Sequence, residues 1–125
     1  DSAKGMAYWK IAEDFIDLSL KSNHSIIYSK IILRELQIKL SEDLFGSKRR
    51  WLEEKSGITL IEFTEDDKAS ARKLESRYHF EVSFYDMIHL AICKRGMFTL
   101  VTRDRQLMQI AKENQVLVIK PEWRL

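Results

Sequence analysis

The chain has 125 residues, of which 45% are hydrophobic and 32% charged, and its formal net charge is +2. One proline and four glycines exclude collagenous and low-complexity chains, and the apolar content excludes a disordered one. We therefore expect a single globular domain over residues 1–125, with a core of its own. So small a net charge identifies no partner by itself.

The cysteine content and the lack of long apolar runs are typical of a cytoplasmic protein. Cys93 is the only cysteine, so no internal disulfide can form, which suits a reducing environment. No apolar run approaches the roughly 20 residues that cross a bilayer. The start of the sequence, DSAKGMAYW, lacks the apolar core of a secretory signal. We expect a soluble protein of the cytoplasm that does not contact a membrane.

Helical and extended patterns alternate along the chain. Apolar residues recur at three- and four-residue steps in MAYWKIAEDFIDLSLK, whereas SIIYS, ITLIEF, MFTLV and VLVI are short apolar runs. Ser29 can cap a helix, and Thr64 with Asp67 has the spacing of a capping box, as has Ser83 with Asp86. The predicted strands cover residues 25–29, 58–63, 97–101 and 116–119, and the predicted helices cover 6–21, 29–40, 48–55, 64–77, 83–95 and 105–114.

The order of these elements predicts the fold class. Strands that alternate with helices form parallel sheets, so we expect an α/β protein, a three-layer α/β/α sandwich with a central parallel sheet. Gly57, Gly96 and Pro121 stand where two helices and the last strand should stop. In such folds ligands bind beyond the carboxyl ends of the strands.

Glu35 is a carboxylate on the apolar side of its predicted helix. At one helical step per residue it lies about 40° from Ile31, in the direction of Ile32. One interpretation is an ordinary i,i+4 pair with Lys39, and the other is a place in a functional site.

Asp86 and Asp104 each stand at the start of a predicted helix. Asp86 can complete a capping box with Ser83, and either Asp104 or Thr102 can cap the helix that follows it. Apolar residues nevertheless surround Asp86 in its helix, which predicts deep burial. A buried carboxylate needs a partner, and a cation is a natural one.

The three acids could meet at one edge of the predicted sheet. Glu35 follows the strand at 25–29 and Asp104 follows the strand at 97–101, while Asp86 begins the helix between. Together they would form a hard oxygen site for Mg²⁺ or Mn²⁺. Such a site suits phosphodiester hydrolysis, because the metal lowers the pKa of bound water and neutralises charge on the phosphate.

Three blocks of the sequence resemble a known family. YSKIILREL, FYDMIHLAICKRG and LVTRDRQL, with the closing VLVIKPE, resemble the second, third and fourth blocks of the PIN domain, a family of metal-dependent ribonucleases. The resemblance covers Ser25 to Glu122. It implies that Glu35, Asp86 and Asp104 are the catalytic, metal-binding acids and that Thr102 supports the last acid and the RNA phosphate.

Basic residues beside these acids are candidates for binding RNA. Arg103 and Arg105 flank Asp104, and the run at 48–50 (KRR) stands beside Trp51. Such a charge run is more often a solvated helix face. No spacing of Cys and His residues predicts a zinc site.

The N-terminus departs from the family pattern. PIN domains begin with a strand that ends in Asp, followed by Ser or Thr and usually Asn. Asp1 and Ser2 imitate this motif, but no strand precedes them and Ala3 replaces the Asn. We therefore expect the first, central strand and its acid to lie upstream, Asp1 to be a loop residue, and the four strands to flank an empty central position.

The leading hypothesis is a metal-dependent endoribonuclease that acts on RNA. Small stand-alone PIN proteins resemble the toxin of a toxin–antitoxin pair, so the resemblance implies an antitoxin protein and a homodimer as partners. A second hypothesis is a catalytically inactive PIN-like module that binds RNA or protein. In a third, the acids are purely structural, as two helix caps and one surface pair.

Overall fold

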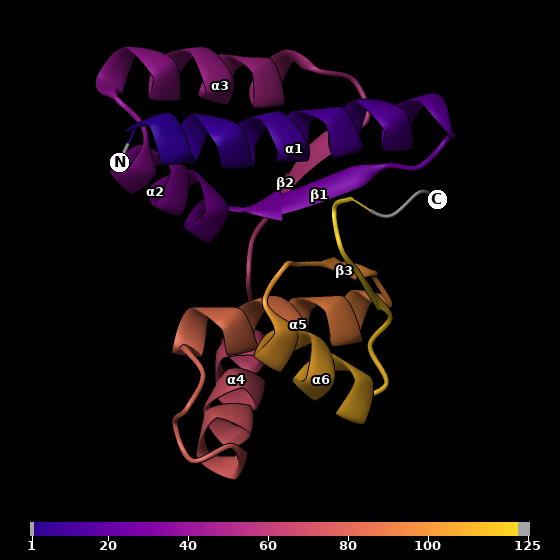
Figure 1. Cartoon of the computed structure of the whole chain (residues 1–125). Coiled ribbons are helices and arrows are strands. Elements are labelled where there is room, and N and C mark those ends of the chain that lie inside the picture. The colour runs from indigo at the N-terminus through magenta and orange to yellow at the C-terminus, as the bar shows by residue number, and fades with distance from the viewer. Residues whose placement is uncertain (1, 123–125) are drawn as a thin grey trace. The chain divides into compact units, whose positions relative to one another are not determined.

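The computed structural model describes the backbone of residues 2–122 and the side chains of residues 9–122 (Figure 1). The predicted placement of Asp1 in a loop therefore lies outside the described residues. The elements are α1 (Ser2–Lys21), β1 (Ile26–Ser29), α2 (Lys30–Lys39), α3 (Glu42–Glu54), β2 (Ile58–Ile61), α4 (Glu65–Arg77), α5 (Phe84–Gly96), β3 (Leu100–Val101), α6 (Arg105–Glu113) and β4 (Val118–Ile119). In the described part of the chain, helices separate successive strands, with two helices between β1 and β2 and two between β2 and β3.

The chain divides into two compact units, the first ending at Glu62 and the second beginning at Phe63. The first unit contains α1, β1, α2, α3 and β2, and the second contains α4, α5, β3, α6 and β4. In each unit two strands pair in parallel, β1 with β2 and β3 with β4. The predicted α/β class with parallel strands is confirmed, whereas a single domain over residues 1–125 stays a prediction.

Helices α1 and α3 pack against each other in the first unit (Figure 1). Trp9 and Trp51 meet edge to face, with their ring centroids 5.7 Å apart. Lys55, which follows α3, reaches Asp17 of α1, where its Nζ lies 2.7 Å from a carboxylate oxygen. The buried apolar residues of this unit are Trp9, Phe15, Ile31, Leu40 and Leu52. The aromatic and ionic contacts fix the register of the two helices.

Helix α5 is the buried helix of the second unit. Its side chains Met87, Ile88 and Leu90 are fully buried, and burial of an aliphatic side chain of this size stabilises a fold by roughly 1.5 to 3 kcal/mol. At the other end of α5, Arg95 donates two hydrogen bonds to Asp67 in the first turn of α4, at 2.9 and 3.0 Å. Apolar packing and this ion pair together join α4 to α5.

The helix starts agree with the predicted caps only in part. The capping box of Thr64 and Asp67 is confirmed, because both of its hydrogen bonds are present, at 2.8 and 3.1 Å. Ser29 occupies the N-cap position of α2, but its side chain makes no capping hydrogen bond. Helix α3 begins well before its predicted start, because the Ser41 hydroxyl accepts a hydrogen bond from the Leu44 N–H at 3.4 Å.

Two glycines are required for different reasons. Gly57 has a φ of +90°, and a Cβ there would lie 2.7 Å from Leu20 Cδ2. Gly96 was predicted to stop its helix, but α5 includes it, and Met97 takes the left-handed conformation with a φ of 56°. A Cβ on Gly96 would collide with the ring of Phe98. Gly96 therefore makes room for an aromatic ring, and Met97 turns the chain.

Strands β3 and β4 are shorter than predicted, because neighbouring residues complete helix ends. The Phe98 N–H donates to the Cys93 carbonyl at 2.9 Å, and the Val116 N–H donates to the Ala111 carbonyl at the same distance. These residues close α5 and α6 instead of extending a sheet. None of the helices in the described part of the chain is long and apolar enough to cross a membrane.

Candidate functional site

Asp86 lies in the first turn of α5, where Ser83 supplies the cap. The Ser83 hydroxyl accepts a hydrogen bond from the Asp86 N–H at 3.0 Å. Among residues 9–122, no donor contacts the Asp86 carboxylate, so the structure shows only half of the predicted capping box. Asp86 is half-buried, so its predicted deep burial is wrong. It lies in the first turn of α5, outside the apolar packing that buries Met87 and Ile88.

His89 lies one helical turn after Asp86 on the same helix. Its burial lowers the pKa of the imidazole below its ordinary value, and the nearby charge of Asp86 opposes that shift without overcoming it. The neutral form of His89 is therefore favoured. A neutral imidazole does not neutralise the Asp86 carboxylate.

Asp104 is the N-cap of α6. Its Oδ1 accepts a hydrogen bond from the Leu107 N–H at 3.1 Å, and its own N–H donates to Thr102 Oγ1 at 3.2 Å. Of the two caps left open by the sequence, Asp104 caps the helix and Thr102 holds the backbone before it. Asp104 is exposed, and the hydrogen bonds that orient it use one of its carboxylate oxygens.

The arginines that flank Asp104 differ in their surroundings. Arg103 Nε lies 2.8 Å from a carboxylate oxygen of Glu122, so an ion pair already compensates its charge. Arg105 is exposed in the first turn of α6, and no ion pair involves it among the described residues. Arg105 is therefore the more available cation of the two.

Glu35 lies on α2 in the first unit and is exposed. Its predicted place on the apolar side of the helix is wrong, because Ile31 is the one buried residue of α2 among those described. Ile38, which the pattern also counts as apolar, is 78% exposed. The buried stripe of α2 is thus narrower than its sequence suggests, and Glu35 lies outside it.

The described side chains do not form a ready metal cluster. Among residues 9–122, no group of three or more His, Cys, Asp and Glu side chains is placed to hold a metal ion. Glu35 belongs to the first unit, whereas Asp86 and Asp104 belong to the second, so neither unit by itself contains all three. Each of them offers the carboxylate oxygens that Mg²⁺ and Mn²⁺ prefer. Their convergence stays a prediction.

The ion pair of Asp67 and Arg95 and a pocket in the first unit were not predicted from the sequence. Asp67 was predicted only as a helix cap, and its pair with Arg95 joins positions that are distant in sequence.

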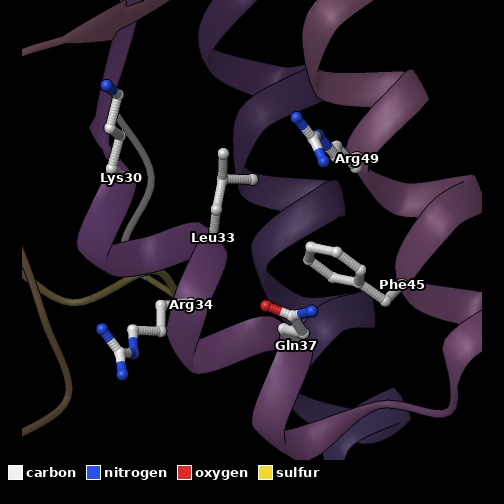
Figure 2. A pocket seen from close by; sticks show the side chains of 6 residues that line it. All are labelled: Lys30, Leu33, Arg34, Gln37, Phe45 and Arg49. Carbon is white, nitrogen blue, oxygen red and sulfur yellow. The ribbon is translucent and has the colours of Figure 1, made fainter.

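Arg34 and Phe45 line a pocket between α2 and α3 (Figure 2). The i,i+4 spacing of Lys30 and Arg34 places two cations on one face of α2, but it does not indicate the pocket itself.

The predicted basic run beside Trp51 is mostly engaged within the first unit. Lys48 Nζ lies 3.5 Å from a carboxylate oxygen of Glu13, and Arg49 Nε lies 2.8 Å from one of Glu53. Trp51 itself packs on α1. These contacts favour the reading of this run as a helix face.

The helices that separate successive strands and the parallel strand pairs define an α/β protein. The family model of the PIN domain matches residues 7–113, which is most of the chain. The chain therefore belongs to the PIN domain family, and the predicted family is confirmed. PIN domains are in general nucleases and typically use divalent metals. A comparison with curated protein sequences found no match.

Proposed function

We propose that this protein is an endoribonuclease that hydrolyses RNA phosphodiester bonds with Mg²⁺ or Mn²⁺. The observation that supports this most directly is the Asp86 carboxylate. It is half-buried at the start of α5, and among the described residues nothing donates a hydrogen bond to it. The cap of α5 does not use this carboxylate, so both of its oxygens could bind a metal ion. Membership of a nuclease family supports a metal-binding role for that carboxylate.

Asp86, Asp104 and Glu35 would hold the ion. The hydrogen bonds from Leu107 and to Thr102 orient Asp104, and the helix dipoles of α5 and α6 favour negative charge at their first turns. When bound, the ion would supply positive charge at the scissile phosphate and lower the pKa of the attacking water. The exposed side chain of Arg105 would contact the RNA phosphate beside Asp104.

A second candidate function is a catalytically inactive module that binds RNA or protein. Two observations favour it. Asp104 already serves as a helix cap, and Arg103 already forms an ion pair with Glu122. Both residues would then have structural reasons to be present. This candidate predicts RNA binding that needs no metal and no Asp86.

We further propose that the protein acts in the cytoplasm as the toxin of a toxin–antitoxin pair and forms a homodimer. Its support is membership of the PIN family. Light scattering after size-exclusion chromatography would measure the dimer mass. A monomer at every concentration tested would contradict the homodimer.

The function is tested by cleavage of a fluorescent single-stranded RNA. The protein should carry any residues that precede this sequence in nature, because a further acid is predicted there. We expect cleavage with Mn²⁺ or Mg²⁺, none with EDTA, and recovery when excess metal is restored. Asp86→Asn should remove cleavage while Asp66→Asn, at an exposed first-turn acid of α4, should keep it. Metal-independent binding without cleavage would favour the inactive module.

A further inference from the structure

A pocket of about 390 Å³ lies between α2 and α3 in the first unit. Figure 2 shows its lining from two helices, with Phe45 and Arg49 reaching from α3 toward α2. The lining residues are Lys30, Leu33, Arg34, Gln37, Phe45 and Arg49. This volume is in the range of small-ligand sites.

The pocket is positively charged. Three of its six lining residues are cations and none is an acid. Lys30 lies 3.1 Å from Glu62 and Arg49 lies 2.8 Å from Glu53, so an acid outside the lining compensates each. No ion pair involves Arg34 among the described residues, and its side chain is exposed. Arg34 therefore supplies the uncompensated charge, which would attract an anion.

The other lining groups suit a nucleobase. Phe45 is a half-buried aromatic residue, and bases stack on aromatic rings without regard to sequence. Gln37 adds an amide that can donate to and accept from a base edge. Figure 2 shows Arg34 pointing away from α3, so the cation and the ring lie apart. A nucleotide also carries its phosphate and its base at opposite ends.

We propose that this pocket binds one nucleotide of a single-stranded RNA, with its phosphate at Arg34 and its base against Phe45. The inference rests on the proposed function in one respect, that RNA is the substrate. Helix α2 would then contribute both this contact and Glu35. An acidic peptide would use the cations but would gain nothing from the aromatic ring.

Binding is measured by fluorescence anisotropy of a labelled single-stranded RNA in EDTA, so that cleavage does not interfere. Arg34→Gln should weaken binding about fivefold and lower the salt dependence by about 0.7 in log–log slope, the effect of one lost phosphate contact. Lys21→Gln is the matched control. It removes one positive charge from an exposed position in the last turn of α1, outside the pocket, and should change the affinity less than about twofold.

Phe45→Leu tests the base contact and should weaken binding about tenfold. A thermal melt of each variant shows whether it is folded, which matters for a half-buried residue. Equal losses from Arg34→Gln and Lys21→Gln would show that the pocket is not the binding site, because charge alone would explain them. If poly-glutamate competes as well as RNA and Phe45→Leu has no effect on binding, the proposal that the pocket binds a nucleotide is wrong.

Competition by free AMP distinguishes a free nucleotide from a nucleotide within an RNA strand as the ligand of the pocket. AMP should compete weakly, since it can make the contacts within this pocket but none of those that a strand makes outside it. AMP that binds more tightly than RNA would overturn the strand as the ligand. Because binding is read in EDTA, loss of cleavage alone counts against the nuclease function and leaves this inference standing. If the protein cleaves RNA but Arg34→Gln and Phe45→Leu do not weaken RNA binding, only the proposed role of the pocket is contradicted.

Discussion

The Ser83 hydroxyl accepts a hydrogen bond from the Asp86 N–H at 3.0 Å, and Ser83 thereby caps α5 without help from the Asp86 carboxylate. In the capping box of α4, by contrast, the Asp67 carboxylate accepts from the Thr64 N–H at 2.8 Å. Two helix starts with the same sequence spacing therefore use their acids differently. Asp67 stabilises the fold, and Asp86 keeps its carboxylate available.

Asp86→Asn should leave the fold nearly unchanged. Asparagine is about as good as aspartate at helix starts, and the cap from Ser83 does not involve the side chain. We expect the free energy of unfolding in urea to change by less than about 0.5 kcal/mol, whereas Ser83→Ala should lose about 1 kcal/mol. A loss of several kcal/mol in Asp86→Asn would show that the carboxylate is structural.

Asp67→Ala should be strongly destabilising. Its side chain is almost fully buried, and the change removes both the cap of α4 and the ion pair with Arg95. We expect a loss of about 2 to 4 kcal/mol in the free energy of unfolding, measured by urea denaturation. Asp66→Ala, at the exposed neighbouring position, is the control and should cost little. Equal costs for the two variants would contradict the role of Asp67.

The same carboxylate should contribute to acid unfolding. Burial raises the pKa of Asp67, but the hydrogen bonds from Arg95 and Thr64 outweigh burial and hold the pKa below its usual 3.8. The unfolded chain therefore binds the proton more readily, and this contribution is present above the usual pKa and lost as pH falls through the folded one. Stability measured against pH should decline less steeply at acid pH in Asp67→Asn. An identical acid decline would contradict this.

Cys93 should be unreactive in the folded protein. It is buried on α5, and burial raises the pKa of its thiol to about 11. The thiolate is the reactive form, so at mild alkaline pH the native chain should react very slowly with a thiol reagent. Labelling should become rapid and stoichiometric in urea. Rapid labelling under native conditions would contradict the burial of this helix.

Features that depend on neighbouring residues could be predicted from the sequence. The order of helices and strands follows from apolar spacing, and the capping box of Thr64 and Asp67 follows from two residues three positions apart. The family was recognisable because its blocks surround Asp86 and Asp104. Local chemistry determines these features, whatever packs against them.

Features that depend on packing could not be predicted. Periodicity placed Glu35 on an apolar face, but which apolar residues are buried depends on the elements beside α2, and Ile38 is left exposed. The partner of Asp67 is an arginine on another helix, which no local pattern identifies. The left-handed turn at Met97 was not predicted. Gly96 stays within α5 and leaves room for the ring of Phe98, which is a packing contact that the sequence does not show.

The role of Asp86 as a metal ligand is tested most directly by Mn²⁺ binding, measured by electron paramagnetic resonance on the wild type, Asp86→Asn and Asp66→Asn. Loss of residues that merely support a metal ligand weakens binding about 10- to 100-fold, so loss of the ligand itself should weaken it at least about tenfold. We expect that loss in Asp86→Asn and none in Asp66→Asn. Equal Mn²⁺ affinity in all three proteins would contradict a metal site at Asp86.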